Sequence, residues 1–318
     1  MRAVMITGLN GPAALQIHDV DDPVRAAGEV LVEVKAVAPA FPDLLMSKGE
    51  YQVKPELPFS PGSDFAGVVL DGPADSEFRP GARIAGCLSY GAAAEKLAVT
   101  EDRIYPIPDE MSFEDAAALP MNYLTAHFAL VTRGGLVKGD TVMVLGASGG
   151  VGSAAIQVAA GLGAEVIAVV SSEERAAVAR EAGAHHSVLR EEVPDRVRQL
   201  TDGAGVDIVV DVVGGDIRNA LRCLAPFGRV MAVGFASGEI PTVKVNRLLL
   251  TNTDVRGVES DYLWTQGTSR QAWDDLLDLS GRGFITPVVR SGGNLDNYGA
   301  ALENLSARSV IGRIVLTV

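Results

Sequence analysis

Residues Thr141–Gly152 read TVMVLGASGGVG, and this stretch decides the fold. Its first five residues, Thr141–Leu145, are mostly apolar and β-branched, as in a buried strand. The glycine-rich segment Gly146–Gly152 follows, and the alanine-rich segment Ser153–Leu162 then predicts a helix. A second apolar run begins at Glu165. We therefore expect a strand, a tight turn and a helix that leads into a second, parallel strand.

The same alternation continues along the chain. Further strands are expected at Glu165–Val170, Ser187–Leu189, Val206–Val212, Arg229–Gly234 and Asp254–Val258, and helices at Glu173–Ala182 and Ile217–Leu224. Strands that are apolar throughout and separated by helices predict a parallel sheet with both faces covered. Right-handed crossovers make such a sheet doubly wound, which is the Rossmann α/β fold.

The first hundred residues have a different character, with many glycines and prolines and only short apolar runs. Strands are expected at Val30–Val37, Ala66–Leu70, Arg83–Ala85 and Ala94–Val99, and a helix from Glu114 to about Val131. We predict a mostly β domain that begins with residues 1–120 and a dinucleotide-binding domain at residues 121–258. Residues 259–318, with a helix at Arg270–Leu279 and a strand at Ile311–Val318, should return to the first domain.

Charge and cysteine content exclude several classes of function. The net charge of -13 argues against nucleic acid or an anionic membrane as partner, because phosphate surfaces would repel it. The two cysteines, Cys87 and Cys223, lie far apart, as is usual in a reducing compartment. The sequence begins without a secretory signal and has no apolar run of about 20 residues. We expect a soluble, cytoplasmic protein.

The glycine-rich segment matches the dinucleotide-binding pattern GxGxxG, with Ala147 in place of the first glycine. Gly149 allows the backbone to approach a pyrophosphate, and Gly152 allows the helix to pack against the strand. Ser148, Gly150 and Val151 complete the turn. The phosphates would lie at the helix N-terminus, where free N–H groups and the helix dipole favour anions.

The same residues contain a second motif. Gly146–Gly150 fits GxSxG, the nucleophile turn of serine hydrolases, with Ser148 as the nucleophile. A hydrolase of that type needs a histidine later in the fold, and the four histidines are His18, His127, His185 and His186. We therefore interpret Ser148 as a turn residue that faces phosphate.

The end of the second strand indicates which dinucleotide is used. NAD enzymes place an acidic residue there, and this chain has Ser171 and then Ser172. Serine leaves room for a 2′-phosphate, and Arg175 and Arg190 are the available cations, although either could instead be a solvated surface residue. The acidic residues at the start of the next helix count mildly against NADPH. We predict NADPH over NADH.

Six motifs distributed over the whole length resemble a known family. They are Phe41–Met46 (FPDLLM), Pro58–Gly67 (PFSPGSDFAG), Leu119–Ala126 (LPMNYLTA), the glycine turn, Asp211–Asp216 (DVVGGD) and Val233–Ser237 (VGFAS). Together they resemble the zinc-free quinone oxidoreductase branch of the medium-chain dehydrogenase/reductase superfamily. The resemblance implies a GroES-like β domain, a Rossmann domain, and cofactor and substrate held between them.

The resemblance also bears on metal binding. Where zinc-dependent members have their ligands, this chain has Ala40, Ser63 and Met121, so no metal site is expected. Asp43 and Asp64 are interpreted as local caps or salt-bridge partners. Members of the branch often have Asn where Ala40 stands, and its absence here puts quinone itself in question as the substrate.

Without a Lewis acid, a conjugated acceptor is favoured, because the charge left by hydride addition spreads over an enolate or a hydroquinone anion. We expect a quinone, enone or enoyl thioester as acceptor. The resemblance places several residues near the nicotinamide. They are Asn122, to which it gives a catalytic role, Thr125, and the backbone of Gly234, Phe235, Ala236 and Ser237.

Tyr51 matches the tyrosine proposed as proton donor in 2-enoyl thioester reductases; the alternative is that its ring only packs at this place. For the chain as a whole, the alternative to an enzyme is a non-catalytic, crystallin-like or regulatory protein that binds NADPH without turnover.

The segment Val243–Val258 predicts a homodimer. Leu248, Leu249 and Leu250 lead into the expected strand Asp254–Val258, and an apolar triplet beside a terminal strand would be exposed in a monomer. Two such edges can pair about a two-fold axis. The alternative is that the leucines form a helix packed on the chain's own first domain.

Overall fold

The computed structural model describes residues 1–307 and 310–318, and the chain divides into two compact units. The first comprises Met1–Met121 with Val289–Val318, and the second comprises Asn122–Val288. Each unit has its own sheet and its own buried apolar cluster. Among the helices of the described residues, none has the length and apolar character needed to span a membrane.

The second unit alternates strands and helices, as predicted. Its strands are β8 (Thr141–Leu145), β9 (Glu165–Val170), β10 (His186–Leu189), β11 (Val206–Asp211), β12 (Leu224–Ala232) and β13 (Asp254–Gly257). Its helices are α4 (Gly150–Gly161), α5 (Glu173–Glu181), α6 (Asp195–Leu200), α7 (Ile217–Cys223), α8 (Asn246–Thr251), α9 (Tyr262–Thr265), α10 (Ser269–Gly281), the 3-10 turn Arg190–Glu192 and most of α3 (Pro120–His127).

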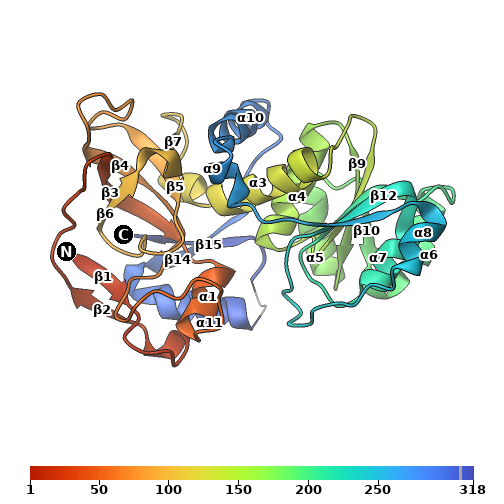
Figure 1. The fold of residues 1–318 in the computed structure, drawn as a ribbon, viewed down its shortest axis with the longest axis horizontal. Coiled ribbons are helices and arrows are strands. Elements are labelled where there is room, and N and C mark those ends of the chain that lie inside the picture. Colours follow the sequence, from red (N-terminus) through yellow and green to blue (C-terminus); the bar gives the residue numbers. More distant parts are fainter. Residues whose placement is uncertain (308–309) are drawn as a thin grey trace. The chain divides into compact units, whose positions relative to one another are not determined.

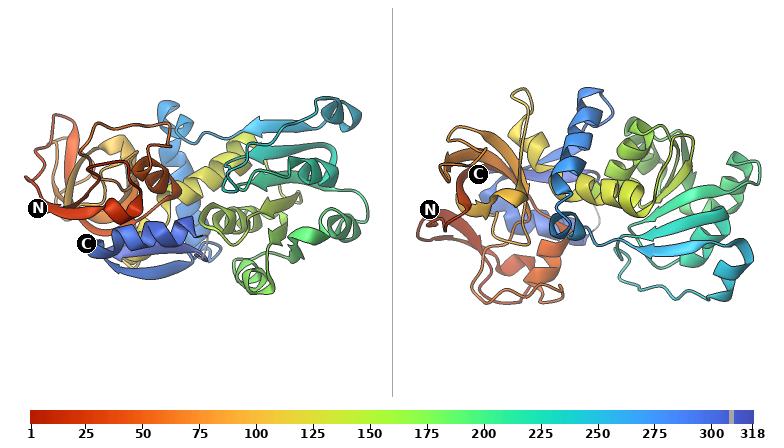
Figure 2. Two further views of the ribbon diagram at one scale, coloured as in Figure 1. Left: turned by 90° about the horizontal axis from the view of Figure 1, so that it is seen from below. Right: turned by 45° about the horizontal axis from the view of Figure 1, so that its top comes forward.

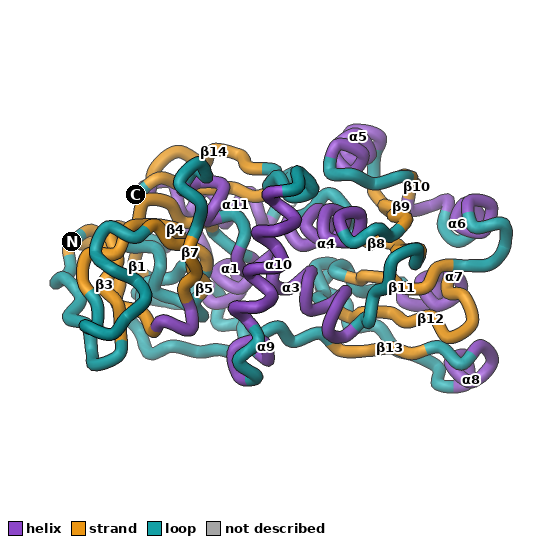
Figure 3. Tube along the Cα trace, turned by 90° about the horizontal axis from the view of Figure 1, so that it is seen from above, coloured by secondary structure: helices purple, strands orange, loops and turns teal. Residues whose placement is uncertain are grey.

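The strands of this unit form a parallel sheet in the order β10-β9-β8-β11-β12-β13 (Figures 1 and 3). The central strands are buried along most of their length, with Val142, Met143 and Val144 fully inaccessible. Helix α4 buries all but a few of its residues, which explains why it is apolar on every side. The doubly wound Rossmann fold predicted from the sequence is confirmed.

The first unit is mostly β. It contains β1 (Arg2–Met5), β2 (Gln16–Asp19), β3 (Glu29–Ala38), β4 (Asp64–Asp71), β5 (Arg83–Cys87), β6 (Lys96–Thr100), β7 (Ile104–Pro106), β14 (Val289–Asn294) and β15 (Arg313–Thr317). Its helices are α1 (Phe41–Ser47), α2 (Phe113–Ala117) and α11 (Tyr298–Ser306), with 3-10 turns at Pro12–Ala14, Glu101–Arg103 and Leu295–Asn297.

The main sheet of the first unit joins the two ends of the chain. Its order is β14-β15-β3-β4-β5-β7, and β6 pairs with β3. The last strand, β15, therefore lies between β14 and the early strand β3, and the chain's last elements lie among its first ones (Figure 2). Alternate residues of β3, from Val30 to Val34, point into the core of this unit. The predicted mostly β, GroES-like domain is confirmed.

Several predicted elements have other bounds in the structure; the strand expected at Arg229–Gly234, for example, is Leu224–Ala232. The helix expected from Glu114 to Val131 is broken into α2, α3 and a π-helical segment at Phe128–Arg133. Pro120 starts α3 because proline lacks an N–H and disfavours helix at the residue before it. The strand expected at Ala94–Val99 begins at Lys96 instead.

The return to the first unit also comes later than predicted, at Val289 instead of residue 259. Helix α10 belongs to the second unit because its buried face, which includes Trp273, Leu276 and Leu279, lies against α4. A Cβ added at Gly161 of α4 would lie 2.9 Å from Leu279. Gln157 of α4 also bonds the backbone of Thr286, just before the chain returns.

Candidate functional site

The glycine turn connects the end of β8 to the start of α4. Gly146 has a φ of +69°, which favours glycine, and its carbonyl accepts the N–H of Gly149 at 3.1 Å. A Cβ at Gly152 would lie 2.2 Å from that same carbonyl oxygen, so only glycine fits there. A Cβ at Gly149 would touch nothing closer than 3.4 Å. The turn is therefore closed beneath Gly152 and open at Gly149, which is what a backbone that receives a pyrophosphate needs.

A cation lies on this turn. The Nη1 of Arg175, in the first turn of α5, donates to the Oγ of buried Ser148 at 2.9 Å. Ser172 caps α5 by accepting the N–H of Arg175, and Ser171 before it is exposed. Arg190 is exposed after β10, where its charge acts on the carboxylate of Asp211. Of the two arginines considered for a 2′-phosphate, Arg175 is the one bonded to the glycine turn.

Asn122 packs against the same turn. A Cβ added at Gly150 would lie 2.5 Å from the Nδ2 of Asn122, so the amide lies directly on the first residue of α4. One turn later on α3, the Oγ1 of Thr125 donates to the Oγ of Ser260 at 3.1 Å. Ser260 belongs to none of the motifs that predict the site from the sequence. Its place directly after the edge strand β13 was the available signal, since ligands of such sheets lie beyond the carboxyl ends of the strands.

The segment from Gly234 to Ser237 follows β12 and is held against the loop after β11. Its N–H groups donate to carbonyls of that loop, Ala236 to Val212 at 3.3 Å and Ser237 to Val213 at 2.8 Å. Asp211 orders the loop by accepting two N–H groups through Oδ1, and burial raises its pKa. The predicted cofactor residues of the second unit thus include loops at the carboxyl ends of several strands of one sheet.

The contacts of Ser148 do not resemble those of a hydrolytic nucleophile. Its hydroxyl is bonded to a guanidinium, which cannot act as a base at neutral pH. Three histidines bond elsewhere: His127 to Asp275, His185 to the N–H of Val166, and His186 to Glu165. His127 is buried, and burial lowers its pKa.

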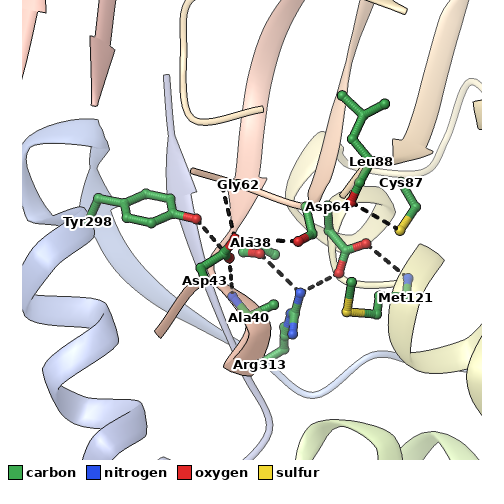
Figure 4. Close-up of polar contacts among 11 residues, drawn as sticks. Ala38, Ala40, Asp43, Gly62, Asp64, Cys87, Leu88, Met121, Tyr298 and Arg313 are labelled. Carbon is green, nitrogen blue, oxygen red and sulfur yellow. Dashed lines mark hydrogen bonds and ion pairs between the residues drawn. The ribbon is translucent and has the colours of Figure 1, made fainter. Parts of the chain in front are cut away.

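A second polar group is buried in the first unit (Figure 4). Asp43 accepts the N–H of Ala40 at 2.7 Å, the N–H of Gly62 at 3.0 Å and the hydroxyl of Tyr298 at 2.9 Å. Ser63 Oγ lies 3.4 Å from the same carboxylate. Burial raises the pKa of Asp43, while these donors lower it. Asp43 thereby caps α1, as the sequence suggested.

Asp64 is the other buried carboxylate of this group. Arg313 of β15 donates to it and to the carbonyl of Ala38, and Met121 donates its N–H at 2.9 Å. Burial raises the pKa of Asp64 to about 6, with Arg313 opposing the rise. Asp64 is thus a salt-bridge partner, also as expected. Arg313 and Tyr298 were missed because they lie about 250 residues away in the sequence, with no local signal to connect them.

This arrangement does not fit a zinc ion. The three positions that correspond to zinc ligands hold Ala40, Ser63 and Met121, of which alanine offers no donor atom. Ser63 and the backbone of the other two already bond the buried carboxylates. Within residues 1–307 and 310–318, no group of three or more His, Cys, Asp or Glu side chains gathers in a metal-binding arrangement.

Tyr51 lies in the first unit and is half-buried. Its ring packs against the small cluster of Ile6, Met46 and Phe59. Phe59 in turn contacts the ring of Tyr90 edge-to-face, with centroids 5.8 Å apart. Packing therefore accounts for the ring of Tyr51, and the chemistry of its hydroxyl stays a prediction.

Comparison with known proteins places this architecture in a family. Residues 26–109 match the alcohol dehydrogenase GroES-like domain, and residues 150–280 match the zinc-binding dehydrogenase family. The chain is 35% identical to quinone oxidoreductase-like protein 2 of Bos taurus, over 99% of this chain and 92% of that protein.

Solved structures agree over the full length. A probable oxidoreductase from Mycobacterium abscessus is 40% identical, with a TM-score of 0.91 over 100% of this chain and 99% of that chain. The quinone oxidoreductase of Thermus thermophilus, solved also as its complex with NADPH, is 33% identical, with a TM-score of 0.87 over 100% of both chains. The chain belongs to the quinone oxidoreductase branch of the medium-chain dehydrogenase/reductase superfamily, and it is an oxidoreductase.

Proposed function

We propose that the chain is an NADPH-dependent oxidoreductase that transfers hydride, without zinc, to a conjugated carbonyl compound: a quinone, an enone or an enoyl thioester. The observation that carries this proposal is the glycine turn with Arg175 bonded to Ser148 and Asn122 packed on Gly150. The complex of the Thermus thermophilus relative with NADPH supports the choice of cofactor.

Each part of the turn has a role in the proposed complex. The open backbone at Gly149 and the N-terminus of α4 bind the pyrophosphate. Arg175 pairs with the 2′-phosphate, and the exposed Ser171 leaves room for it. Asn122 and Thr125 orient the nicotinamide, together with the backbone from Gly234 to Ser237. When bound, NADPH supplies the hydride.

The absence of zinc from the proposal rests on Ala40, Ser63 and Met121. A conjugated acceptor needs no Lewis acid, because its own π system spreads the charge that hydride transfer creates. An enolate also needs a proton at carbon, and we propose Tyr51 as its donor. A phenol with an ordinary pKa near 10 is protonated at neutral pH.

A substrate panel tests this function. NADPH oxidation is measured against quinones, enones and enoyl thioesters, with product analysis and with a chelator in parallel. The proposal expects turnover of at least one class that survives chelation; stoichiometric zinc with activity lost to chelation would refute the metal-free part. Binding of NADPH without any turnover would favour the alternative of a crystallin-like or regulatory protein. In the same panel, Tyr51→Phe should slow the reduction of enones and leave the reduction of quinones unchanged.

Arg175→Ala should weaken NADPH binding by roughly 10- to 100-fold, because a charge-assisted contact contributes about 1.5–3 kcal/mol. NADH binding should change little, since NADH lacks the 2′-phosphate. Fluorescence titration of both cofactors measures the difference. Arg180→Ala on the same helix is the matched control, because Arg180 bonds Ser187 instead of the glycine turn. Equal losses of affinity for NADPH and NADH would mean that Arg175 does not bind the 2′-phosphate.

We also propose a homodimer through the edge strand β13. Leu249 and Leu250 lie on α8 directly before this strand, and they are 77% and 72% exposed. The leucines thus form a helix, but these two remain on the surface. Light scattering should give a dimer mass that Leu249→Glu reduces to the monomer. Val24→Glu, at another exposed apolar position, should leave the dimer intact. A wild-type monomer at micromolar concentration would contradict this proposal.

We also propose that the protein is located in a reducing compartment such as the cytoplasm. Cys87 and Cys223 are both buried and in the reduced state, and burial raises the pKa of Cys223 to about 12, which keeps its thiol unreactive. Cell fractionation tests this location, and recovery outside the cytoplasm would contradict it.

A further inference from the structure

Asp64 has one hydrogen bond that is neither local in sequence nor part of its ion pair with Arg313. Its Oδ1 accepts the backbone N–H of Met121, a residue 57 positions later in the chain. Met121 is the second residue of α3, the helix that continues into Asn122 and Thr125. Figure 4 shows the carboxylate of Asp64 between this N–H and the guanidinium of Arg313.

The start of α3 needs such a partner. The first N–H groups of a helix have no partner within the helix and are usually capped by a polar side chain just before it. Here the preceding residue is Leu119, which has no acceptor in its side chain, and Pro120 has no N–H. Asp64 therefore supplies the acceptor that the local sequence lacks.

The position of Asp64 is fixed in turn by Arg313. One nitrogen of this guanidinium, Nη2, donates both to the carboxylate and, at 3.0 Å, to the carbonyl of Ala38 in β3. Asp64 is fully buried and Arg313 is 8% exposed. A buried carboxylate that has two charged or backbone donors and no access to water is restricted to one orientation.

We propose that Asp64 is a positioning residue for hydride transfer: by holding the N–H of Met121, it fixes the start of α3 and thereby the direction of Asn122 and Thr125. This inference rests on the proposed function, in which those two side chains orient the nicotinamide. Asp64 acts through the backbone of α3.

Asp64→Asn tests the proposal. In Asp64, Oδ1 accepts the N–H of Met121 and Oδ2 accepts the guanidinium of Arg313. Asparagine replaces one of these oxygens by an NH2 group, which cannot accept, and the charged Arg313 attracts the remaining oxygen more strongly. Met121 then loses its acceptor. We expect kcat with NADPH and the best panel acceptor to fall roughly 10- to 100-fold, as for a small misplacement of an orienting group. The Kd of NADPH should stay unchanged, because the phosphates bind at α4.

The double variant D64N/R313M should restore the kcat that D64N loses. Without the guanidinium, the amide oxygen is free to accept the N–H of Met121, so most of the lost kcat should return. Asp140→Asn is the matched control: Asp140 also joins a backbone N–H to an arginine, through Val137 and Arg229, and it lies directly before β8, at the opposite end of that strand from the glycine turn. It should leave kcat unchanged. If D64N does not fold, R313K retains the buried charge but replaces the planar guanidinium that orients Asp64 by an ammonium group, and it should lower kcat with an unchanged Kd.

Hydrogen exchange separates this proposal from the proposed function. The amide of Met121 should exchange faster in D64N than in D140N, whether or not the protein turns over substrate. A wild-type protein without turnover would refute the proposed function. Faster exchange at Met121 in D64N would then still show that Asp64 holds the start of α3. A folded D64N with wild-type kcat, a folded double variant without recovery, or unchanged exchange at Met121 would overturn the positioning role.

Discussion

Gly152→Ala should abolish useful NADPH binding. The new Cβ would lie 2.2 Å from the carbonyl oxygen of Gly146 and 2.9 Å from the Cα of Ala147. Both are backbone atoms in a turn closed by the bond from Gly149 to Gly146, so the turn has to open. We expect NADPH to bind at least about 100-fold more weakly, or about 2.8 kcal/mol. We also expect the free energy of unfolding to fall by about 1–3 kcal/mol from overpacking.

Two other glycines show whether this loss comes from the ligand site or from the fold. Gly149→Ala has room for its methyl group in the protein, with the nearest atom at 3.4 Å, but the methyl would occupy the proposed approach of the pyrophosphate. It should lower affinity and leave stability intact. Gly281→Ala, where no atom lies within 4 Å of the new Cβ, should change neither. Fluorescence titration and urea unfolding measure both quantities, and full affinity in Gly149→Ala would place the phosphates elsewhere.

The sequence predicted the second unit more completely than the first for a physical reason. A buried parallel sheet consists of continuous apolar strands, and β8 and β9 were predicted to the residue. The glycine turn was equally clear, because the positive φ of Gly146 and the close backbone contacts at Gly152 both favour glycine. These signals are local, so a short stretch of sequence contains them entirely.

Contacts between distant segments could not be predicted in this way. Asp43 and Asp64 are bound by Tyr298 and Arg313, which come from the last 30 residues of the chain. The packing of α11 on α1 and the pairing of β15 with β3 bring them near. The placement of α10 in the second unit likewise depends on its packing against α4 and on Gln157, since an amphipathic helix has the same pattern whichever core it covers.

Arg313→Met should cause the largest loss of stability among single substitutions in the first unit's polar group. It removes the guanidinium next to fully buried Asp64 and leaves the carboxylate with the N–H of Met121 as its remaining described backbone donor. An uncompensated buried charge costs about 3–5 kcal/mol. We expect the free energy of unfolding at pH 8 to fall by about that amount. Arg2→Met, which breaks an ion pair that is about half exposed on both sides, should cost about 1 kcal/mol or less.

The pH dependence of this loss follows from the pKa of Asp64. In the wild type, burial raises this pKa from 3.8 to about 6, so the folded state holds the proton more tightly than the unfolded state does. The contribution of Asp64 to stability is therefore greatest below pH 3.8 and falls as the pH rises to about 6. Removing Arg313 removes a group that lowers the pKa, so in the variant the fall should continue to higher pH.

The destabilisation by Arg313→Met should consequently be smaller at pH 5 than at pH 8, because a protonated Asp64 needs no cation. Urea unfolding of wild type, Arg313→Met and Arg2→Met at both pH values measures it. A loss that is the same at pH 5 and pH 8 would mean that Arg313 stabilises the unit through its packing and its bond to Ala38 rather than by compensating the charge of Asp64. In that case D64N/R313M should be no more stable than Arg313→Met alone, whereas charge compensation requires the double variant to be the more stable of the two at pH 8.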